Sequence, residues 1–348
     1  GGGAIWPAVT YNNLHDLYGL AYVEDNSTHY TIKMCWISGS SQTVLACDEI
    51  YDGAKNKEMA TPSIAFNNND ANDDFMIVWQ EGDIGNFSIY GHRTTPASPY
   101  TGVGSRIDVA VTPREPSMSD WEFKAPDVTY NLNMNEYLVV FEYWYLDSED
   151  LAMHSDILGR RIFNNGGGPA NLPYLSIATG FCDQASPSVA AYRLNQNTPY
   201  FVAYQDNLLF SSPNMYACSS TSWIRGNYLF KDATLADPTN QILVDSGATP
   251  DITASEALGA YTITWTKDSG SNLDIYLRQI DPSSGLRELP VLVSGDVANV
   301  RGDEFVPVVA GGAPTTFVAW HEFGWGTGTS DVIGRIIGYQ VFLPLIVK

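Results

Sequence analysis

The segment Tyr137-Leu-Val-Val-Phe141, followed by Asp156-Ile-Leu-Gly-Arg-Arg161, decides the fold. Its β-branched and aromatic residues alternate with a period of two, which predicts a β-strand. Similar aromatic segments occur five more times, at 18–22, 75–79, 200–204, 261–265 and 316–320. Segments related to Asp156–Arg161 follow most of them, clearly at 88–93, 274–278 and 331–335 and more weakly at 29–33 and 214–218. The chain therefore contains an internal repeat of strand pairs.

Two further segments complete the repeat. A proline followed two residues later by a β-branched residue recurs at intervals of about sixty residues, at Pro7, Pro62, Pro126, Pro187, Pro250 and Pro307. A last segment contains Leu-Pro in three repeats, at 172–175, 289–292 and 343–346. Its other members are predicted at 43–47, 106–111 and 240–244. Each repeat thus contains four short strands.

Six units of four strands, separated by Gly/Asn/Asp/Pro turns, predict an all-β protein, a six-bladed β-propeller with four antiparallel strands per blade. We expect one domain over residues 1–348, with blades at approximately 5–52, 60–112, 124–179, 185–245, 248–295 and 305–348. The Leu-Pro segments should lie on the outer edge, because proline cannot donate to a ladder, and the Pro-x-Val segments near the axis. The aromatics that should pack between blades are Trp79, Phe141, Tyr204, Trp265 and Trp320.

This repeat resembles that of TolB-type six-bladed propellers. It is still more similar to secreted bacterial repeat proteins of the Tyr-Leu-Val-Val-Trp and Asp-Ile-Tyr-Gly-Arg-Arg type. The resemblance covers residues 6 to 348 and implies a propeller, without implying one activity. The chain departs from the TolB pattern because Asn-rich loops replace Ser-Pro-Asp-Gly between the first two strands.

The composition excludes several classes of function. Eighteen Lys+Arg against 39 Asp+Glu give a net charge of -21, which disfavours nucleic acid and anionic membrane surfaces as partners. No apolar run reaches the ~20 residues of a membrane span, so no membrane insertion is expected. The chain begins with glycines rather than a charged and apolar leader, so we expect any signal peptide to have been removed.

The four cysteines predict an oxidising, extracellular or cell-surface location. The pairing with the shortest loops joins Cys35 to Cys47 and Cys182 to Cys218, while four reduced buried thiols are the alternative. Asn26 and Asn86 begin N-glycosylation sequons.

An apolar segment lies close to the C-terminus, Val341-Phe342-Leu343-Pro-Leu345-Ile346-Val347. One interpretation is that it completes the sixth blade. The other is that it, or an outer edge strand, also pairs with a neighbouring copy, which would give a homopolymer or filament. The blade formed by the first repeat is expected to pack face to face on the sixth and close the ring.

Carboxylates recur two residues after the aromatic position, as Glu24, Glu81, Asp206 and Glu322, with Glu142 one position earlier. Glycosidase propellers place acids around a central funnel, so hydrolysis is one interpretation. The other is a cross-strand ion pair with Arg93, Arg160 or Arg161, and Arg335 on the next strand. The recurrence in successive repeats favours the ion pairs, so no catalytic residue is predicted.

The loop at 67–74 is rich in hard oxygen ligands, and Asp70, Asn72 and Asp74 have the alternating spacing of calcium loops. A solvated turn is the alternative, because the glycine and distal glutamate of an EF-hand are missing. The five histidines share no metal-binding spacing, and no nucleotide-binding loop is present. No cofactor other than calcium is therefore expected.

These features favour a non-enzymatic, extracellular structural or adhesive propeller, as the subunit of a fibre or surface layer. The alternative is a carbohydrate-binding or glycoside-hydrolysing propeller that uses carboxylates at the channel mouth, with glycans as partners.

Overall fold

The computed structural model describes most of the chain. The described residues are 4–26, 28–53, 57–67, 74–95, 101–111, 121–147, 152–163, 173–180, 182–194, 197, 199–212, 215–236, 241–270, 272–283, 285–294, 302–311, 315–324 and 330–338. No helix in this part of the chain is long and apolar enough to cross a membrane.

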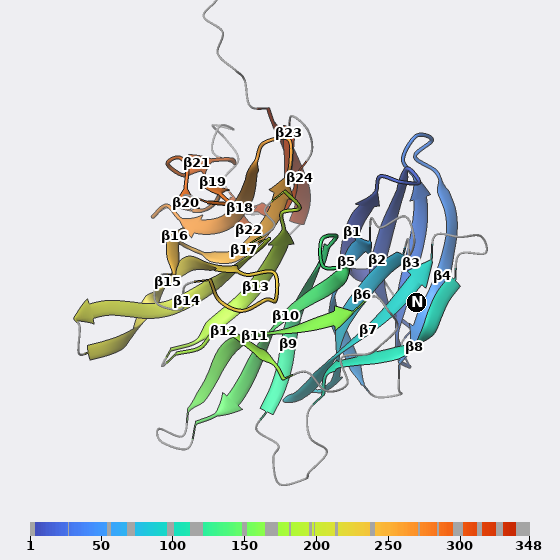
Figure 1. Cartoon of the computed structure of the whole chain (residues 1–348), viewed down its shortest axis with the longest axis horizontal. Coiled ribbons are helices and arrows are strands. Elements are labelled where there is room, and N and C mark those ends of the chain that lie inside the picture. The colour runs from blue at the N-terminus through green and yellow to red at the C-terminus, as the bar shows by residue number, and fades with distance from the viewer. Residues whose placement is uncertain are drawn as a thin grey trace, which may run out of the picture.

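Six antiparallel sheets, here called blades 1 to 6, follow one another along the chain (Figure 1). The strands of blades 1 and 2 are β1 (Ala4–Asn12), β2 (Leu17–Asp25), β3 (Tyr30–Ser38), β4 (Val44–Asp52), β5 (Glu58–Asn67), β6 (Asp74–Asp83), β7 (Asn86–Thr95) and β8 (Thr101–Ala110). Those of blades 3 and 4 are β9 (Trp121–Asn131), β10 (Glu136–Leu146), β11 (Met153–Phe163), β12 (Leu175–Ala178), β13 (Gln184–Ala191), β14 (Tyr200–Ser212), β15 (Met215–Leu229) and β16 (Ile242–Ser246). Those of blades 5 and 6 are β17 (Ala248–Ser255), β18 (Ala260–Asp268), β19 (Leu273–Asp281), β20 (Gly285–Leu286), β21 (Val291–Leu292), β22 (Gly302–Gly311), β23 (Thr315–Gly324) and β24 (Ser330–Gly338).

The predicted six-bladed propeller is confirmed, with four antiparallel strands in most blades. The first strand of each blade is the innermost, and the Leu-Pro segments of blades 3 and 5 lead into the outer strands β12 and β21, as predicted. Blade 5 splits its outer position between β20 and β21. Blade 6 has three described strands, and residues 343–346 lie outside the described part of the chain.

A hydrophobic core lies between each pair of consecutive blades, from blades 1 and 2 to blades 5 and 6. The aromatic residue of each second strand is buried in one of these cores, as predicted, at Trp79, Phe141, Tyr204, Trp265 and Trp320. Each of them faces the preceding blade. Burying these large side chains is the main reason why separate sheets associate.

A β-bulge precedes the proline of every innermost strand. The residue before each proline has a positive φ of 45° to 50°, at Trp6, Thr61, Ala125, Ser186, Thr249 and Val306. The strand register shifts at the same six places. A bulge bends its strand and redirects the following side chains. In this fold the bulges lie where the innermost strands begin, so they set the direction of the residues that line the axis.

The boundary between blades 6 and 1 differs from the other five. Among the described residues, no hydrophobic core joins these two blades, although face-to-face packing was expected there. The ring is therefore held by five cores in the described part of the chain.

Candidate functional site

The innermost strands of all six blades line an axial channel with a cavity of about 680 Å³. The residue after the recurrent proline of each repeat lines this channel, and its identity changes around the ring. The series reads Ala8, Ser63, Asp127, Ser188, Asp251 and Val308.

Four of these residues connect one blade to the next. Asp127 Oδ2 of blade 3 accepts a hydrogen bond of 2.7 Å from the Val189 N–H of blade 4. Asp251 Oδ2 of blade 5 accepts one of 2.6 Å from the Val309 N–H of blade 6.

The serines of blades 2 and 4 make the same kind of contact with blades 3 and 5, respectively. Ser63 Oγ accepts a hydrogen bond from the Val128 N–H at 3.3 Å, and Ser188 Oγ accepts one from the Ile252 N–H at 3.2 Å. We call Ser63, Asp127, Ser188 and Asp251 the axial belt. It runs from blade 2 to blade 6.

The Ser188 hydroxyl lies 3.0 Å from Asp127 Oδ2 and 2.9 Å from Asp251 Oδ1. A hydroxyl group has one hydrogen, so it can donate to only one of the two carboxyls, and the other can hydrogen-bond to Ser188 Oγ only when it carries a proton itself. Burial and the neighbouring Asp127 charge raise the pKa of Asp251 to about 7. Burial also raises the pKa of Asp127, whose carboxylate accepts from Ser63 at 2.6 Å as well as from Val189. We therefore assign the carboxyl proton of this pair to Asp251, and the Ser188 hydroxyl then donates to Asp127.

This belt is built for cohesion between blades. Both aspartate residues are partly exposed at the channel, but their carboxyl oxygens already make hydrogen bonds to neighbouring blades. A catalytic carboxylate needs an oxygen that is available to substrate. The belt is also interrupted at Ala8 and Val308, whose side chains have no hydrogen-bonding atom.

The recurrent acids of the second strands are mostly paired within their blades, as the ion-pair interpretation predicted. Glu24 lies 3.5 Å from Lys33 Nζ, Glu81 lies 3.4 Å from Arg106 Nη1, and the buried Asp206 lies 2.7 Å from Arg225 Nε. The side chain of Glu322 lies outside the described residues. These three pairs explain the recurrence of the acids without catalysis.

Glu142 has a different structural role. Its Oε1 accepts a hydrogen bond of 2.7 Å from the Ser186 N–H in the bulge of blade 4, and its Oε2 accepts one from Trp144. Gln80 caps the bulge amide of Ala125 in the same way at 2.9 Å. Burial raises the pKa of Glu142.

Glu81 and Glu142 have partners other than the predicted arginines, while the pairing of Arg335 with Glu322 stays a prediction, because the Glu322 side chain lies outside the described residues. Arg93 pairs with Asp74, and Arg161 pairs with Glu136 at 2.8 Å. Arg160 and Arg335 donate instead to backbone carbonyls of the preceding blade. Their acceptors are Val109 O and Val293 O, both at 2.5 Å. An arginine at this position therefore joins two blades, because its long side chain reaches past its own sheet.

A second group of polar and aromatic residues lies at the end of blade 3 where the innermost strand begins. Trp121 of β9 packs edge-to-face on Tyr143 of β10, with ring centroids 5.9 Å apart. Tyr143 stacks on Tyr145 at 5.2 Å. All three side chains are partly exposed. We call Trp121, Tyr143 and Tyr145 the aromatic platform.

Two acidic residues border the platform. The Asp156 carboxylate accepts hydrogen bonds from the Tyr145 hydroxyl and from the Gly180 N–H, the latter at 3.2 Å. Burial nevertheless raises the pKa of Asp156 to about 6, with a small contribution from the charge of Asp183. The same environment raises the pKa of Tyr145 to about 12, again mainly through burial.

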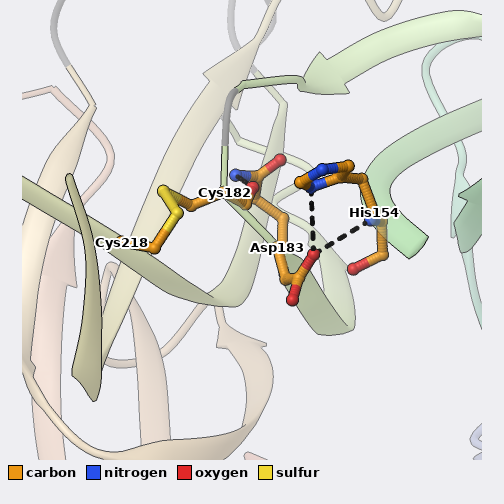
Figure 2. Close-up of a disulfide and its surroundings, with 6 residues drawn as sticks. His154, Cys182, Asp183 and Cys218 are labelled. Carbon is orange, nitrogen blue, oxygen red and sulfur yellow. Dashed lines mark hydrogen bonds and ion pairs between the residues drawn. A yellow bond between two sulfur atoms is a disulfide. The ribbon is translucent and has the colours of Figure 1, made fainter. Parts of the chain in front are cut away.

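Asp183 is held beside His154, as Figure 2 shows. Its Oδ1 accepts a hydrogen bond of 3.3 Å from the Ser155 N–H and lies 3.7 Å from His154 Nδ1. The preceding residue, Cys182, forms a disulfide with Cys218 of β15. The disulfide therefore anchors the connection between blades 3 and 4 that carries Asp183. Cys35 and Cys47 form the other predicted disulfide, between β3 and β4.

The remaining sequence predictions have mixed outcomes. Asp70 and Asn72 lie outside the described residues, while Asp74 binds Arg93, Tyr137 and Asn67. No group of three metal-binding side chains occurs among the described residues, and the calcium site stays a prediction. Asn26 and Asn86 are exposed, and their glycosylation also stays a prediction. The apolar segment 341–347 lies outside the described residues, so the proposed contact with another copy stays a prediction.

Sequence reasoning missed both the axial belt and the aromatic platform. Serine and aspartate alternate in the sequence after the recurrent prolines of repeats 2 to 5, and this pattern marks the belt. The run Tyr143-Trp144-Tyr145 was also visible, because the other second strands do not continue with three aromatics. In the sequence Asp156 is only the first residue of a repeated segment. Its contacts with Tyr145 and Gly180 become visible only in the folded structure.

Several solved structures superpose on this chain, and they include sialidases and an α-L-arabinofuranosidase. A Hadza microbial sialidase, Hz136, superposes with a TM-score of 0.59 at 10% identity, covering 97% of this chain and 66% of the sialidase. The Trypanosoma rangeli sialidase in complex with the inhibitor DANA gives 0.57 at 8% identity, covering 96% of this chain and 55% of that one.

An α-L-arabinofuranosidase from Fusarium graminearum, in complex with an iminosugar inhibitor, gives a TM-score of 0.57 at 11% identity. This match covers 96% of this chain and 93% of the arabinofuranosidase. No protein-family model and no curated protein matches the chain. These matches are glycosidase propellers rather than the TolB-type propellers that the repeat suggested. At such low identity they establish a shared six-bladed fold and no more.

Proposed function

We propose that the protein is an extracellular glycan-binding propeller and that the aromatic platform of blade 3 is its sugar site. The observation that carries the proposal is the cluster of three partly exposed rings beside two carboxyl groups and an imidazole. The two disulfides support the extracellular location, since such bonds persist in oxidising compartments. The fold likeness adds that this architecture hosts sugar-acting proteins.

The chemistry of the platform suits a sugar ring. A pyranose has C–H groups on its faces and hydroxyl groups around its rim. The partly exposed rings of Trp121 and Tyr145 offer apolar area, and a Tyr hydroxyl offers a polar end, while Tyr143 supports them by stacking on Phe123 and Tyr145. Carboxyl oxygens such as those of Asp183 can accept hydrogen bonds from hydroxyl groups. An apolar surface with a few fixed polar groups is what a specific small-ligand site requires.

Glycoside hydrolysis at the same place is the second candidate, and the pKa of Asp156 favours it. A carboxyl with a pKa of about 6 can hold a proton for a leaving group, and glycosidases pair such an acid with a second carboxyl group. Asp156→Asn should then abolish hydrolysis and leave binding largely intact. If the wild-type protein releases no reducing sugar from any glycan that it binds, the hydrolase candidate is excluded and binding stands alone.

A glycan array probed with purified protein tests the proposal. The wild-type protein should bind a defined set of oligosaccharides, and Trp121→Ala and Tyr145→Ala should each weaken binding about tenfold or more. The matched control is Phe230→Ala, since Phe230 is exposed in the connection after β15, away from the platform. Equal binding by the platform variants and the wild type would refute the site, and binding to no glycan would refute the function.

A further inference from the structure

A cavity of about 540 Å³ lies at the end of blade 5 where its innermost strand begins. The aromatic platform lies at the same end of blade 3. The walls of the cavity come from blades 4, 5 and 6, and we call it the blade-5 cavity. Lys267 lines it together with five hydroxyl-bearing residues, which are Thr221, Ser222, Ser246, Thr249 and Thr266.

Blade 5 lacks an acceptor that three other blades provide. In blades 2, 3 and 4, the residue after the second-strand aromatic accepts a hydrogen bond from the bulge amide of the following blade. The pairs are Gln80 with Ala125, Glu142 with Ser186 and Gln205 with Thr249. In blade 5 this residue is Thr266, whose hydroxyl contacts the Thr249 hydroxyl at 3.2 Å instead. Among the described side chains, none accepts a hydrogen bond from the bulge amide of Val306, which borders the cavity. Blade 1 has Val23 at this position, but Val23 is buried in the core between blades 1 and 2.

The next position of blade 5 lacks an acceptor as well. Two residues after the aromatic, blades 1, 2 and 4 have an acidic residue, whereas blade 5 has Lys267. In blade 2, the Trp79 Nε1–H donates to Glu81 at 3.4 Å. The equivalent Trp265 is fully buried, and its Nε1 has no hydrogen-bond partner in the described part of the chain. Gly247, which lines the cavity, lies against that nitrogen, since a Cβ on it would be 3.1 Å from Nε1.

Both replacements change the site in the same direction, because each removes an oxygen acceptor and the second adds N–H donors. A ligand that complements such a site supplies acceptor oxygens and no donor of its own. We propose that the blade-5 cavity binds a carboxylate group, carried by an acidic sugar or by a small organic acid. The donors that this group would meet are the Val306 N–H, Lys267 Nζ and the Thr266 hydroxyl.

The charges around the cavity are compatible with a bound carboxylate. Lys267 Nζ contacts the two carboxyl oxygens of Asp245 at 2.9 and 2.8 Å. An ammonium group has three hydrogens, so one remains for a ligand. Asp268 also borders the cavity, but it is exposed, and its Oδ1 accepts a hydrogen bond of 2.7 Å from the Gly270 N–H. Water and salt screen an exposed charge, so its repulsion of the ligand is weak.

An NMR titration of full-length protein with isotope-labelled valine tests the proposal. The Val306 amide signal is assigned by its loss in Val306→Ala, a residue that blade 3 already has at this position as Ala125. Sodium acetate and sodium glucuronate are the probes, and glucose and sodium chloride are the controls. Both acids should shift the Val306 signal until it saturates, and the two controls should not. Tighter binding of glucuronate would identify an acidic sugar as the source of the carboxylate, whereas equal binding would identify a small organic acid.

Two variants should remove the site without disturbing the fold. Thr266→Gln gives blade 5 the acceptor that blades 2 and 4 have at this position. Its amide oxygen should accept from the Val306 N–H, so binding of both acids should be lost while resistance to urea is kept. Lys267→Met removes the charged donor and should weaken binding about tenfold. The matched control, Thr43→Gln, changes an exposed threonine beside β4 of blade 1 and should bind as the wild type does.

Three results would overturn the proposal. They are a Val306 signal that shifts with neither acid, a shift with glucose equal to that with glucuronate, and undiminished binding by Thr266→Gln. The site does not depend on the aromatic platform, because acetate contains no sugar ring and Trp121→Ala should bind it as the wild type does. A failure of the glycan array would therefore leave this site intact, and a failure of the titration would leave the platform intact.

Discussion

The Val189 N–H donates a 2.7 Å hydrogen bond to Asp127 Oδ2 and thereby joins blade 4 to blade 3 at the axis. The same contact recurs from Ser63, Ser188 and Asp251 to the blade that follows each. Such contacts matter because each blade is a separate sheet, and among the described strands no backbone ladder crosses from one sheet to the next. The axial belt supplies hydrogen bonds where the inter-blade cores end.

Replacing Asp127 should therefore destabilise the whole ring. Asp127→Ala removes the acceptor of the Val189 N–H and the partner of two serine hydroxyls, so we expect a loss of ~1–3 kcal/mol in the free energy of unfolding. Asp127→Ser is the matched control, because serine fills this position in blades 2 and 4, and its loss should be clearly smaller. Urea unfolding measures both. Equal stability of Asp127→Ala and wild type would contradict the belt.

The stability of the protein should depend on the protonation of Asp251. Its pKa is raised to about 7 in the folded state, so the folded protein binds more protons than the unfolded chain between pH 4 and 7. This contribution to stability is complete below about pH 4 and is lost as the pH rises through 7. Asp251→Asn and Asp251→Ser should both flatten the decline between pH 5 and 7, measured by urea unfolding. An unchanged slope in both variants would show that Asp251 does not carry the proton.

The two disulfides should differ in their contribution to stability. Cys182–Cys218 spans 36 residues and Cys35–Cys47 spans 12, so chain entropy predicts about 4 and about 3 kcal/mol, respectively. Replacing each pair with alanines and comparing chemical denaturation tests this order. Loss of Cys182–Cys218 should also weaken glycan binding, because the disulfide anchors Asp183, whereas loss of the other should not. If glycan binding is weakened by loss of Cys35–Cys47 and not by loss of Cys182–Cys218, Asp183 is not part of the sugar site.

Residues at one repeat position should have very different energetic roles. Asp206→Ala leaves the Arg225 guanidinium buried without its carboxylate, which should cost about 3–5 kcal/mol. Glu24→Ala breaks a partly exposed pair with Lys33 and should cost less than about 1 kcal/mol. Thermal unfolding of both variants gives the comparison. Similar costs would mean that burial does not govern this ion-pair series.

The repeat was sufficient to predict the architecture, because strand segments such as Tyr137–Phe141 recur in every repeat, although both faces of these second strands are buried rather than one. Residue spacing also gave both disulfides, since the shortest loops, ending at Cys35 and Cys47 and at Cys182 and Cys218, were the correct ones. Local sequence carries this information directly.

The contacts between blades were not predictable in the same way. Arg335 looked like a partner for an acid on the same sheet, but it reaches Val293 O of blade 5 because the blades lie close together. The aromatic platform likewise depends on the register that sets Tyr145 opposite Trp121 and His154. The connection that carries Asp183 then brings a carboxylate beside it. These relationships are long-range and leave no local pattern.

The most direct test of the central claim is a crystal structure of the full-length protein with an oligosaccharide selected on the glycan array. We predict a sugar ring stacked on the platform of Trp121, Tyr143 and Tyr145, with hydroxyl groups bonded to Asp156 or Asp183. A sugar bound in the axial channel among the recurrent prolines, with the platform empty, would contradict the account.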